Sequence, residues 1–356
     1  MEGFGGGWKM YIFNGRFLER RVTGVERFAR EILLELDKII PPNTIQLAIS
    51  AQVKEIPDYH NIKVVQVGRR HGNLWEQLDL PRYAIKNKGL LVNLCNTAPF
   101  CKTDIVCVHD MAIKAYPHFY SRRYVLWERL MLANIFKKAK GIITVSEFSK
   151  QEIIRYYAPK QRIQVIYNSW EHEERIQADD AVFQKFPMLK EKNYFFSMSS
   201  MAPNKNVRWI VETAKKNPDH YFVVSGNVNK KVFGDADQEQ FGKNFIYAGY
   251  LSDGEAKALM SKCKAFIFPT FYEGFGIPPM EAMSCGADAI VSDNDCMREI
   301  YGEHVVYIDP KVPCEDIRKI HFKDGDEASE EKKRFLERYS WRRSAEILLR
   351  FLREVC

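Results

Sequence analysis

The sequence predicts an α/β protein with two doubly wound parallel-sheet domains. The chain has 356 residues, which exceeds the roughly 100–200 residues of one ordinary domain. Short apolar segments alternate with amphipathic segments along both halves, a pattern typical of parallel sheets covered by helices on both faces. A polar stretch at 169–192, poor in apolar periodicity, separates the halves. We therefore expect one domain over 1–170 and a second over 171–341.

The first half predicts strands and helices in alternation. The strand segments are short and apolar, and the helical segments are longer and amphipathic. Ser146 precedes the last helix as an N-cap, a position that serine favours. Strands are expected at 9–13, 44–49, 62–67, 90–94, 104–108, 141–145 and 163–166, and helices at 25–39, 75–85, 122–138 and 147–156.

The second half predicts the same alternation. Doubly wound sheets bind ligands outside the carboxyl ends of their strands, so we expect functional residues directly after strands, in a cleft between the two sheets. Strands are expected at 194–198, 221–225, 245–247, 265–268, 287–291 and 305–308, and helices at 207–216, 254–262, 279–284, 296–301 and 329–356.

Charge is distributed unevenly along the chain. The net charge is +7; residues 1–170 hold 26 Lys and Arg against 15 Asp and Glu, and residues 171–356 hold 27 against 31. A basic first half fits an anionic membrane surface or a phosphorylated acceptor. Nucleic acid is the rival partner, but no helix-turn-helix, finger or RNA-binding signature supports it. Solvated surface lysines and arginines explain the surplus equally well.

Neither metal binding nor membrane insertion is indicated. The eight cysteines form no Cys-x2-Cys pair and no zinc-like cluster with histidine. Asp293-Asn294-Asp295 follows a strand, but turn chemistry explains these residue types. No signal peptide and no apolar run of the ~18 residues that span a bilayer are present. We expect a reduced, cytoplasmic setting and no metal.

The most informative segment is 271–281, Phe-Tyr-Glu-Gly-Phe-Gly-Ile-Pro-Pro-Met-Glu. A strand leads into it and a helix leads out, so Glu273 lies in the loop and Glu281 in the first helical turns. Glycines permit close approach of the backbone, and a helix start suits a phosphate. The segment predicts a site for a phosphorylated, hydroxyl-rich ligand. The residues expected to contact it between the two glutamates are Gly274, Phe275, Gly276 and Ile277.

This segment resembles the Glu-x7-Glu signature of the retaining glycosyltransferases of family 4, of the type that builds bacterial surface polysaccharides. The match includes the preceding Phe-Pro-Thr and the following Ala-Met. The resemblance implies the GT-B fold, two Rossmann-like domains facing a central cleft, with the acceptor bound by the first and the donor by the second. It also implies that Glu273 lies at the transferred sugar and that Glu281 binds the ribose hydroxyls of the nucleotide. A closing helix at about 342–356 would pack back onto the first domain.

Two further segments of the second half match this family. Lys205 follows the first strand, where the family holds the donor diphosphate with cations, and Asn204 stands where an arginine is often found. Gly249, Tyr250 and Leu251 correspond to residues that meet the nucleobase through backbone groups. The resemblance therefore adds all five residues to the expected donor site.

The first half contributes two candidate residues. Gly24 opens a helix after a basic loop, where it would approach the acceptor or the sugar, or simply form the turn into the helix. His109 follows strand 104–108, where it can hydrogen-bond a sugar hydroxyl or cap the strand. The resemblance implies contact with the transferred sugar, so we class His109 as catalytic together with Glu273. Trp75-Glu76-Gln77-Leu78 also recurs in the family, and we assign it to packing near the acceptor cleft.

The expected activity is retaining transfer of a hexose-type sugar from a GDP-, UDP- or dTDP-linked donor, without metal or other cofactor. The acceptor would be a saccharide or lipid-linked saccharide in capsule, O-antigen or similar biosynthesis. A sugar-nucleotide epimerase on the same fold and a non-catalytic sugar-binding partner are the alternatives. Glu273 could be a nucleophile or an electrostatic stabiliser. We expect a cytoplasmic protein, with peripheral attachment to the inner face of the cytoplasmic membrane as a further option.

Overall fold

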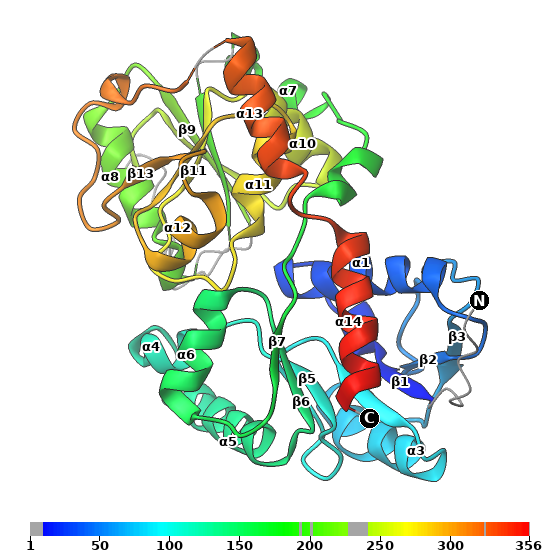
Figure 1. Cartoon of the computed structure of the whole chain (residues 1–356). Helices are drawn as coiled ribbons and strands as arrows, with labels where there is room; N and C mark the ends of the chain where they lie inside the picture. Colours follow the sequence, from blue (N-terminus) through cyan, green and yellow to red (C-terminus); the bar gives the residue numbers. More distant parts are fainter. Residues whose placement is uncertain (1–9, 192–193, 200–201, 227–240, 324, 356) are drawn as a thin grey trace. The chain divides into compact units, whose positions relative to one another are not determined.

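The computed structural model describes residues 10–191, 194–199, 202–226, 241–323 and 325–355 (Figure 1). Contacts divide the chain into two units. The first unit comprises Met1–Asn168 and Trp341–Cys356, and the second comprises Ser169–Ser340. Each unit is built on one parallel sheet, and the last helix of the chain belongs to the first unit.

The first unit has a seven-stranded sheet of order β3-β2-β1-β4-β5-β6-β7. All its strand pairs are parallel. Because β1 and β4 are neighbours, the chain winds outward from them in opposite directions, which creates a topological switch point. The strands are β1 (Tyr11–Asn14), β2 (Ile45–Ile49), β3 (Lys63–Gln66), β4 (Leu90–Asn93), β5 (Ile105–Cys107), β6 (Gly141–Thr144) and β7 (Ile163–Val165).

Helices connect these strands and begin at identifiable caps. α1 begins after Thr23, which forms a capping box with Glu26. Ser146 caps α6 by accepting a hydrogen bond from the backbone N–H of Ser149 at 2.9 Å. The helices and turns are η1 (Gly15–Glu19), α1 (Gly24–Ile39), α2 (Gly72–Leu74), η2 (Trp75–Asp79), α3 (Leu80–Lys86), α4 (Ala112–Ala115), η3 (Pro117–Phe119), α5 (Arg122–Lys138), α6 (Glu147–Tyr157) and α14 (Trp341–Val355).

The terminal helix α14 packs against α1 (Figure 1). The rings of Phe28 and Trp341 meet edge to face with centroids 6.2 Å apart, and both side chains are fully buried. The amphipathic pattern of α14 places its apolar face in this contact. The end of the chain is therefore part of the core of the first unit.

The second unit has a six-stranded parallel sheet of order β10-β9-β8-β11-β12-β13. This is the same winding as in the first unit, with the switch point between β8 and β11. Its strands are β8 (Tyr194–Met198), β9 (Tyr221–Ser225), β10 (Phe245–Gly249), β11 (Ala265–Phe268), β12 (Ala289–Ser292) and β13 (Val306–Ile308). Its helices and turns are η4 (Glu171–Arg175), α7 (Val182–Lys185), η5 (Pro187–Glu191), η6 (Pro203–Lys205), α8 (Val207–Lys216), α10 (Asp253–Lys262), α11 (Ile277–Ser284), α12 (Asp295–Tyr301), η8 (Ile317–Lys319) and α13 (Asp326–Leu336).

The α/β prediction of two doubly wound sheets is confirmed. The helix expected at 75–85 starts as a π-helix, η2, directly before Pro81, which has no N–H to donate four residues back. The helical region expected at 329–356 consists of two helices, α13 and α14. The stretch at 169–192, expected to be the interdomain connection with an excursion, holds η4, α7 and η5. The expected first strand began at Lys9, which lies outside the described residues.

Among the described residues, no helix combines the length and the apolar character needed to cross a bilayer.

Candidate functional site

The switch point of the second unit brings Lys205 and Glu273 together. Lys205 ends η6 after β8, and Glu273 lies in the loop between β11 and α11. Lys205 Nζ lies 2.6 Å from Glu273 Oε1, and Thr270 Oγ1 donates to the same oxygen at 2.8 Å. The lysine side chain is 23% exposed and the glutamate side chain 13%. A cation and a carboxylate therefore share a partly open position at the carboxyl edge of the sheet.

Hydrogen bonds to backbone carbonyls connect the loops around this pair. The carbonyl of Asn204 accepts from the N–H of Phe271 at 2.8 Å and lies 2.9 Å from Thr270 Oγ1. Asn206 has a left-handed backbone with φ 55°, and its Nδ2 donates to the carbonyls of Pro269 and Pro310 at 2.9 and 2.7 Å. Asn204, expected to contact the donor, thus has a structural role through its carbonyl.

The start of α11 is shaped by packing as much as by access to a ligand. Gly276 has φ 81°, and a Cβ there would lie 2.7 Å from Met297 Cε. Tyr301 donates its hydroxyl to the carbonyl of Gly276. The left-handed backbone therefore favours glycine at this position, and the expected approach of the backbone to a ligand remains a prediction. The side chains of Phe275 and Ile277 are buried.

The phosphate expected at this helix start meets fewer donors than a regular helix offers. Pro278 and Pro279 occupy the first turn and have no N–H groups. Lys205, from a separate loop, contacts this loop through Glu273, and its role in holding a donor diphosphate remains a prediction.

Glu281, on α11, is held by a residue that the sequence reasoning missed. His172 Nε2 lies 2.9 Å from Glu281 Oε1, and Glu173 Oε1 lies 3.7 Å from the same nitrogen. All three side chains are buried, and their donor atoms lie within 4.8 Å of one another, close enough to hold a metal ion. Lys257 fixes η4 by donating to the carbonyls of Glu173 and Ile176. The expected absence of metal remains a prediction.

Gly249 ends β10, and Tyr250 and Leu251 follow it, two strands away from β8 at the same edge of the sheet. Gly249 has φ 72°, and the register of β10 shifts between Tyr247 and Gly249. Tyr250 is 58% exposed, whereas Leu251 is buried. An exposed ring and a kinked backbone at this edge could present backbone groups to a base, and this role remains a prediction.

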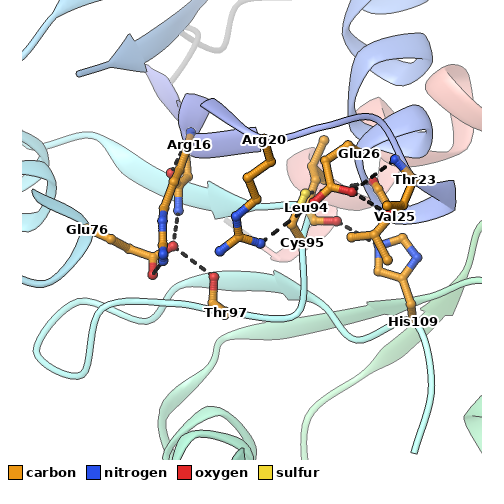
Figure 2. Close-up of polar contacts among 11 residues, drawn as sticks. Arg16, Arg20, Thr23, Val25, Glu26, Glu76, Leu94, Cys95, Thr97 and His109 are labelled. Atoms are coloured by element: carbon orange, nitrogen blue, oxygen red, sulfur yellow. Dashed lines mark hydrogen bonds and ion pairs between the residues drawn. The ribbon is translucent and has the colours of Figure 1, made fainter. Parts of the chain in front are cut away.

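In the first unit, Gly24 and His109 occupy different environments. Gly24 is the exposed first residue of α1, directly after the capping residue Thr23. His109 follows β5 and is only 5% exposed. Its Nε2 lies 2.8 Å from the carbonyl of Leu94, and its ring meets that of Phe28 edge to face, with ring centroids 5.1 Å apart. Figure 2 shows His109 beside the start of α1.

Burial lowers the pKa of His109 to about 4, so the ring is neutral near pH 7. The carbonyl of Leu94 requires a donor, which places the proton on Nε2 and makes Nδ1 an acceptor. The backbone is fixed on both sides, since the N–H of His109 donates to Asn96 and Ser149 Oγ donates to its carbonyl. His109 can accept a hydrogen bond from a hydroxyl but supplies no positive charge.

A hollow lies at the switch point of the first unit, and Figure 2 shows the polar contacts among its lining residues. Arg16 Nη1 lies 2.6 Å from Glu76 Oε2, while Asn14 Nδ2 and Thr97 Oγ1 each donate to Glu76 Oε1 at 2.8 Å. The sequence reasoning assigned Glu76 to packing and missed the other three. The hollow is lined by Asn14, Arg16, Phe17, Arg20, Glu76, Leu94, Cys95 and Thr97.

Two family models match the chain. Residues 94–174 match the model described as Glycosyltransferase Family 4, and residues 179–327 match the model described as Glycosyl transferases group 1. Together they cover the segment with His109 and the loops with Lys205, Glu273 and Glu281.

Curated relatives and a solved structure agree with these matches. The chain is 28% identical over 232 residues to the O-antigen chain mannosyltransferase RfbU of Salmonella typhimurium, covering 63% of this chain and 62% of that protein. It is 29% identical over 218 residues to the O-antigen chain mannosyltransferase B of Escherichia coli, covering 58% and 57%. Both matches span less than two thirds of the relative.

The fold is similar to that of Anabaena Alr3699/HepE, solved in complex with UDP and glucose, with a TM-score of 0.69 and 16% identity over 97% of this chain and 99% of that one. The chain therefore matches glycosyltransferase family models in both of its units and has the GT-B fold.

Proposed function

We propose that this protein is a retaining glycosyltransferase that transfers a hexose from a nucleotide-diphosphate sugar to a saccharide or lipid-linked saccharide in surface-polysaccharide biosynthesis. The observation that carries the proposal is the Lys205–Glu273 pair at the switch point of the second sheet. The relatives named as O-antigen chain mannosyltransferases support mannose as the transferred sugar. The neighbour solved with UDP and glucose supports a nucleotide-linked donor, and leaves the base open between GDP, UDP and dTDP.

The charge pair fits the chemistry of glycosyl transfer. Departure of the sugar leaves negative charge on a diphosphate and positive charge on an oxocarbenium-like ring, so catalysis needs a fixed cation and a fixed carboxylate. When the donor binds, Lys205 leaves its ion pair with Glu273 and pairs with the diphosphate instead. It can do so because an ammonium on a flexible stem can move between acceptors. Glu273 then supplies negative charge at the sugar, and the leaving phosphate accepts the proton of the acceptor hydroxyl.

Glu281 and His109 complete the proposed chemistry. Glu281 accepts hydrogen bonds from the ribose hydroxyls. This contact positions the nucleotide before its diphosphate reaches Lys205. His109 presents Nδ1 to a hydroxyl of the transferred sugar, a contact that needs a neutral ring. The lowered pKa of His109 keeps the ring in that form across the physiological range.

A panel of nucleotide sugars tests the proposal. Purified full-length protein is incubated with GDP-mannose, UDP-glucose and dTDP-glucose, with and without neutral saccharide acceptors, and products are followed by NMR. We expect acceptor-dependent release of a nucleoside diphosphate and a new glycoside with the anomeric configuration of the donor. Interconversion of epimers without release would favour the epimerase, and neither reaction would favour a sugar-binding partner.

We further propose that α5 contacts an anionic membrane surface. Its exposed side chains include Tyr124, Leu126, Trp127 and Leu130. Exposed arginines are interleaved with them at 122, 123 and 129. A helix with apolar, aromatic and basic side chains facing solvent is typical of interfacial binding, and each basic residue contributes about 1 kcal/mol near an anionic surface. A lipid-linked acceptor would be reached from such a surface.

Vesicle co-sedimentation tests this contact. We expect binding to phosphatidylglycerol vesicles at low salt, weak binding to phosphatidylcholine vesicles, and release at high salt. Leu126→Glu should reduce binding, whereas Ile56→Glu, at an exposed apolar position of the same unit outside α5, should not. Absence of binding to the anionic vesicles at low salt would contradict the proposal and favour an acceptor without a lipid.

A further inference from the structure

The loop that carries Glu273 has one side-chain anchor in its last three residues. Gly274, Phe275 and Gly276 connect Glu273 to α11, and only Phe275 among the three has a side chain. That side chain is 3% exposed, so it packs into the interior of the second unit. Because glycine leaves the backbone free to adopt many conformations, the packing of Phe275 determines where this part of the loop lies.

The ring of Phe275 packs against Tyr339, near the end of the second unit. The two rings meet edge to face, with centroids 5.7 Å apart and an interplanar angle of 86°, an arrangement that aromatic pairs favour. The hydroxyl of Tyr339 donates to the carbonyl of Ile300 on α12 at 2.7 Å. Burial raises the pKa of Tyr339, so the hydroxyl stays protonated near pH 7 and continues to donate. Tyr339 is therefore held at its hydroxyl while its ring contacts the loop.

Two more aromatic residues complete a closed set of contacts around the end of the loop. Phe335, on α13, meets Tyr339 edge to face with centroids 5.6 Å apart, and the ring of Tyr301, on α12, lies beside Phe335 with centroids 6.0 Å apart. Tyr301 in turn donates its hydroxyl to the carbonyl of Gly276, which follows Phe275. Helix α13 also contacts α11, the helix that follows the loop (Figure 1). The end of the loop is thus held by residues of two other helices and by Tyr339.

The beginning of the same loop is held separately. The N–H of Phe271 donates to the carbonyl of Asn204 at 2.8 Å, and Thr270 Oγ1 lies 2.8 Å from Glu273 Oε1. Glu273 therefore lies between two anchors, one formed by hydrogen bonds and the other by aromatic packing. Loss of the aromatic anchor would free the end of the loop and leave the hydrogen-bonded beginning in place.

We propose that Tyr339 is a positioning residue for Glu273, because through Phe275 it holds the loop in the place where the carboxylate acts on the transferred sugar. The proposal rests on the proposed glycosyltransferase function and adds a residue from the opposite end of the second unit. Tyr339 precedes Ser340, the last residue of that unit, so the loop is fixed to the segment in which the chain leaves the unit. Displacement of a catalytic group by about 1 Å can lower a rate about a hundredfold. The contact should therefore affect turnover more than nucleotide affinity.

Steady-state kinetics of full-length Tyr339→Leu, with the donor that the nucleotide-sugar panel identifies, test the proposal. We expect kcat to fall by about tenfold to a hundredfold, while the KM for the donor and the calorimetric affinity for the nucleoside diphosphate stay near the wild-type values. Tyr339→Phe keeps the ring and should retain nearly all of the wild-type kcat. Tyr307→Leu is the matched control, since Tyr307 is also half-buried and donates to a carbonyl just after α12, that of Gly302, at 2.7 Å. Its kcat should stay near the wild-type value.

Phe275→Leu removes the same contact from the side of the loop, so the test does not depend on the folding of Tyr339→Leu. It should reproduce the fall in kcat, and the double variant should be no slower than the slower single variant, because both substitutions remove one interaction. Wild-type kcat in folded Tyr339→Leu or Phe275→Leu, or an equal loss in Tyr339→Phe or Tyr307→Leu, would overturn the positioning role and leave the glycosyltransferase proposal standing. Failure of the wild type to turn over any donor would overturn both.

Discussion

The two sheets have the same strand order, and each carries a cation–carboxylate pair at its switch point. Arg16 and Glu76 lie 2.6 Å apart in the first unit, and Lys205 and Glu273 lie 2.6 Å apart in the second. In both, a threonine hydroxyl donates to the carboxylate at 2.8 Å, from Thr97 and Thr270. One topology thus produces nearly the same local arrangement twice.

The cation and its exposure distinguish the two pairs. The guanidinium of Arg16 is a planar fork in a largely buried network, whereas Lys205 is a compact charge on a flexible stem and is more exposed. A fixed fork suits recognition of sugar hydroxyls, and a movable ammonium suits a diphosphate whose charge grows during the reaction. The same position in the fold therefore carries a largely buried guanidinium in one unit and a more exposed, flexible ammonium in the other.

The largest expected effect is on turnover, from Glu273→Ala. If Glu273 acts at the sugar, kcat should fall on the order of a hundredfold to a thousandfold, as for other groups that stabilise transition-state charge. Nucleoside diphosphate affinity, measured by calorimetry, should change much less. A folded variant with near-normal turnover would show that the Lys205–Glu273 pair has only a structural role. The proposed difference from the Arg16–Glu76 pair would then be lost.

Glu281→Gln should weaken nucleotide binding by about 1–3 kcal/mol, because a charged hydrogen-bond acceptor for the ribose is lost. Calorimetry with nucleoside diphosphates and with the corresponding bases measures this. Affinity for the base alone should stay the same in the variant. Unchanged nucleoside diphosphate affinity in a folded protein would refute the ribose role.

His109 should make the first unit sensitive to acid. Its folded pKa of about 4 lies below the value of 6.5 for an unperturbed histidine, so between these values the unfolded state binds more protons and stability falls as pH falls. The loss between pH 7 and pH 5 should be about 2 kcal/mol. His109→Asn should remove that part of the pH dependence, as read from urea unfolding monitored in the first unit. An unchanged pH profile would mean that the ring is not held neutral.

His172→Ala should weaken nucleotide binding by about 1 kcal/mol through the freed carboxylate of Glu281. Because His172 acts as a positioning residue, the effect should appear in the KM for the donor, and His172→Asn should restore part of it. His304→Asn is the control, since His304 lies 3.7 Å from a glutamate, Glu331, elsewhere in the second unit. Equal effects of His172→Ala and His304→Asn would assign His172 to general stability.

The smallest expected effect is that of a metal chelator. Activity should persist in excess EDTA, since we propose that Lys205 supplies the positive charge at the diphosphate. The cluster of His172, Glu173 and Glu281 is where a metal would bind if this expectation is wrong. Activity that is lost in EDTA and restored only by added metal would contradict it.

The strands and the donor loop could be predicted because the residues that specify each of them are adjacent in the sequence. Apolar runs mark the strands, and Glu273 and Glu281 belong to one contiguous segment with glycines and prolines at recognisable positions. Pairs formed by distant segments could not be predicted. Arg16 and Glu76 are 60 residues apart, and His172 and Glu281 are 109 apart, so only the strand order brings them together. A charged stretch such as 171–174 looks solvated in sequence, yet His172 and Glu173 are buried.

The central claim is that the Lys205–Glu273 pair binds the nucleotide and the Arg16–Glu76 pair does not. Calorimetric titration of GDP and UDP into the full-length Lys205→Gln and Arg16→Gln variants tests this most directly. We predict that Lys205→Gln weakens binding of the cognate nucleoside diphosphate by about tenfold, as for loss of a charge-assisted hydrogen bond, whereas Arg16→Gln leaves it unchanged. Weaker nucleotide binding in Arg16→Gln with normal binding in Lys205→Gln would contradict it.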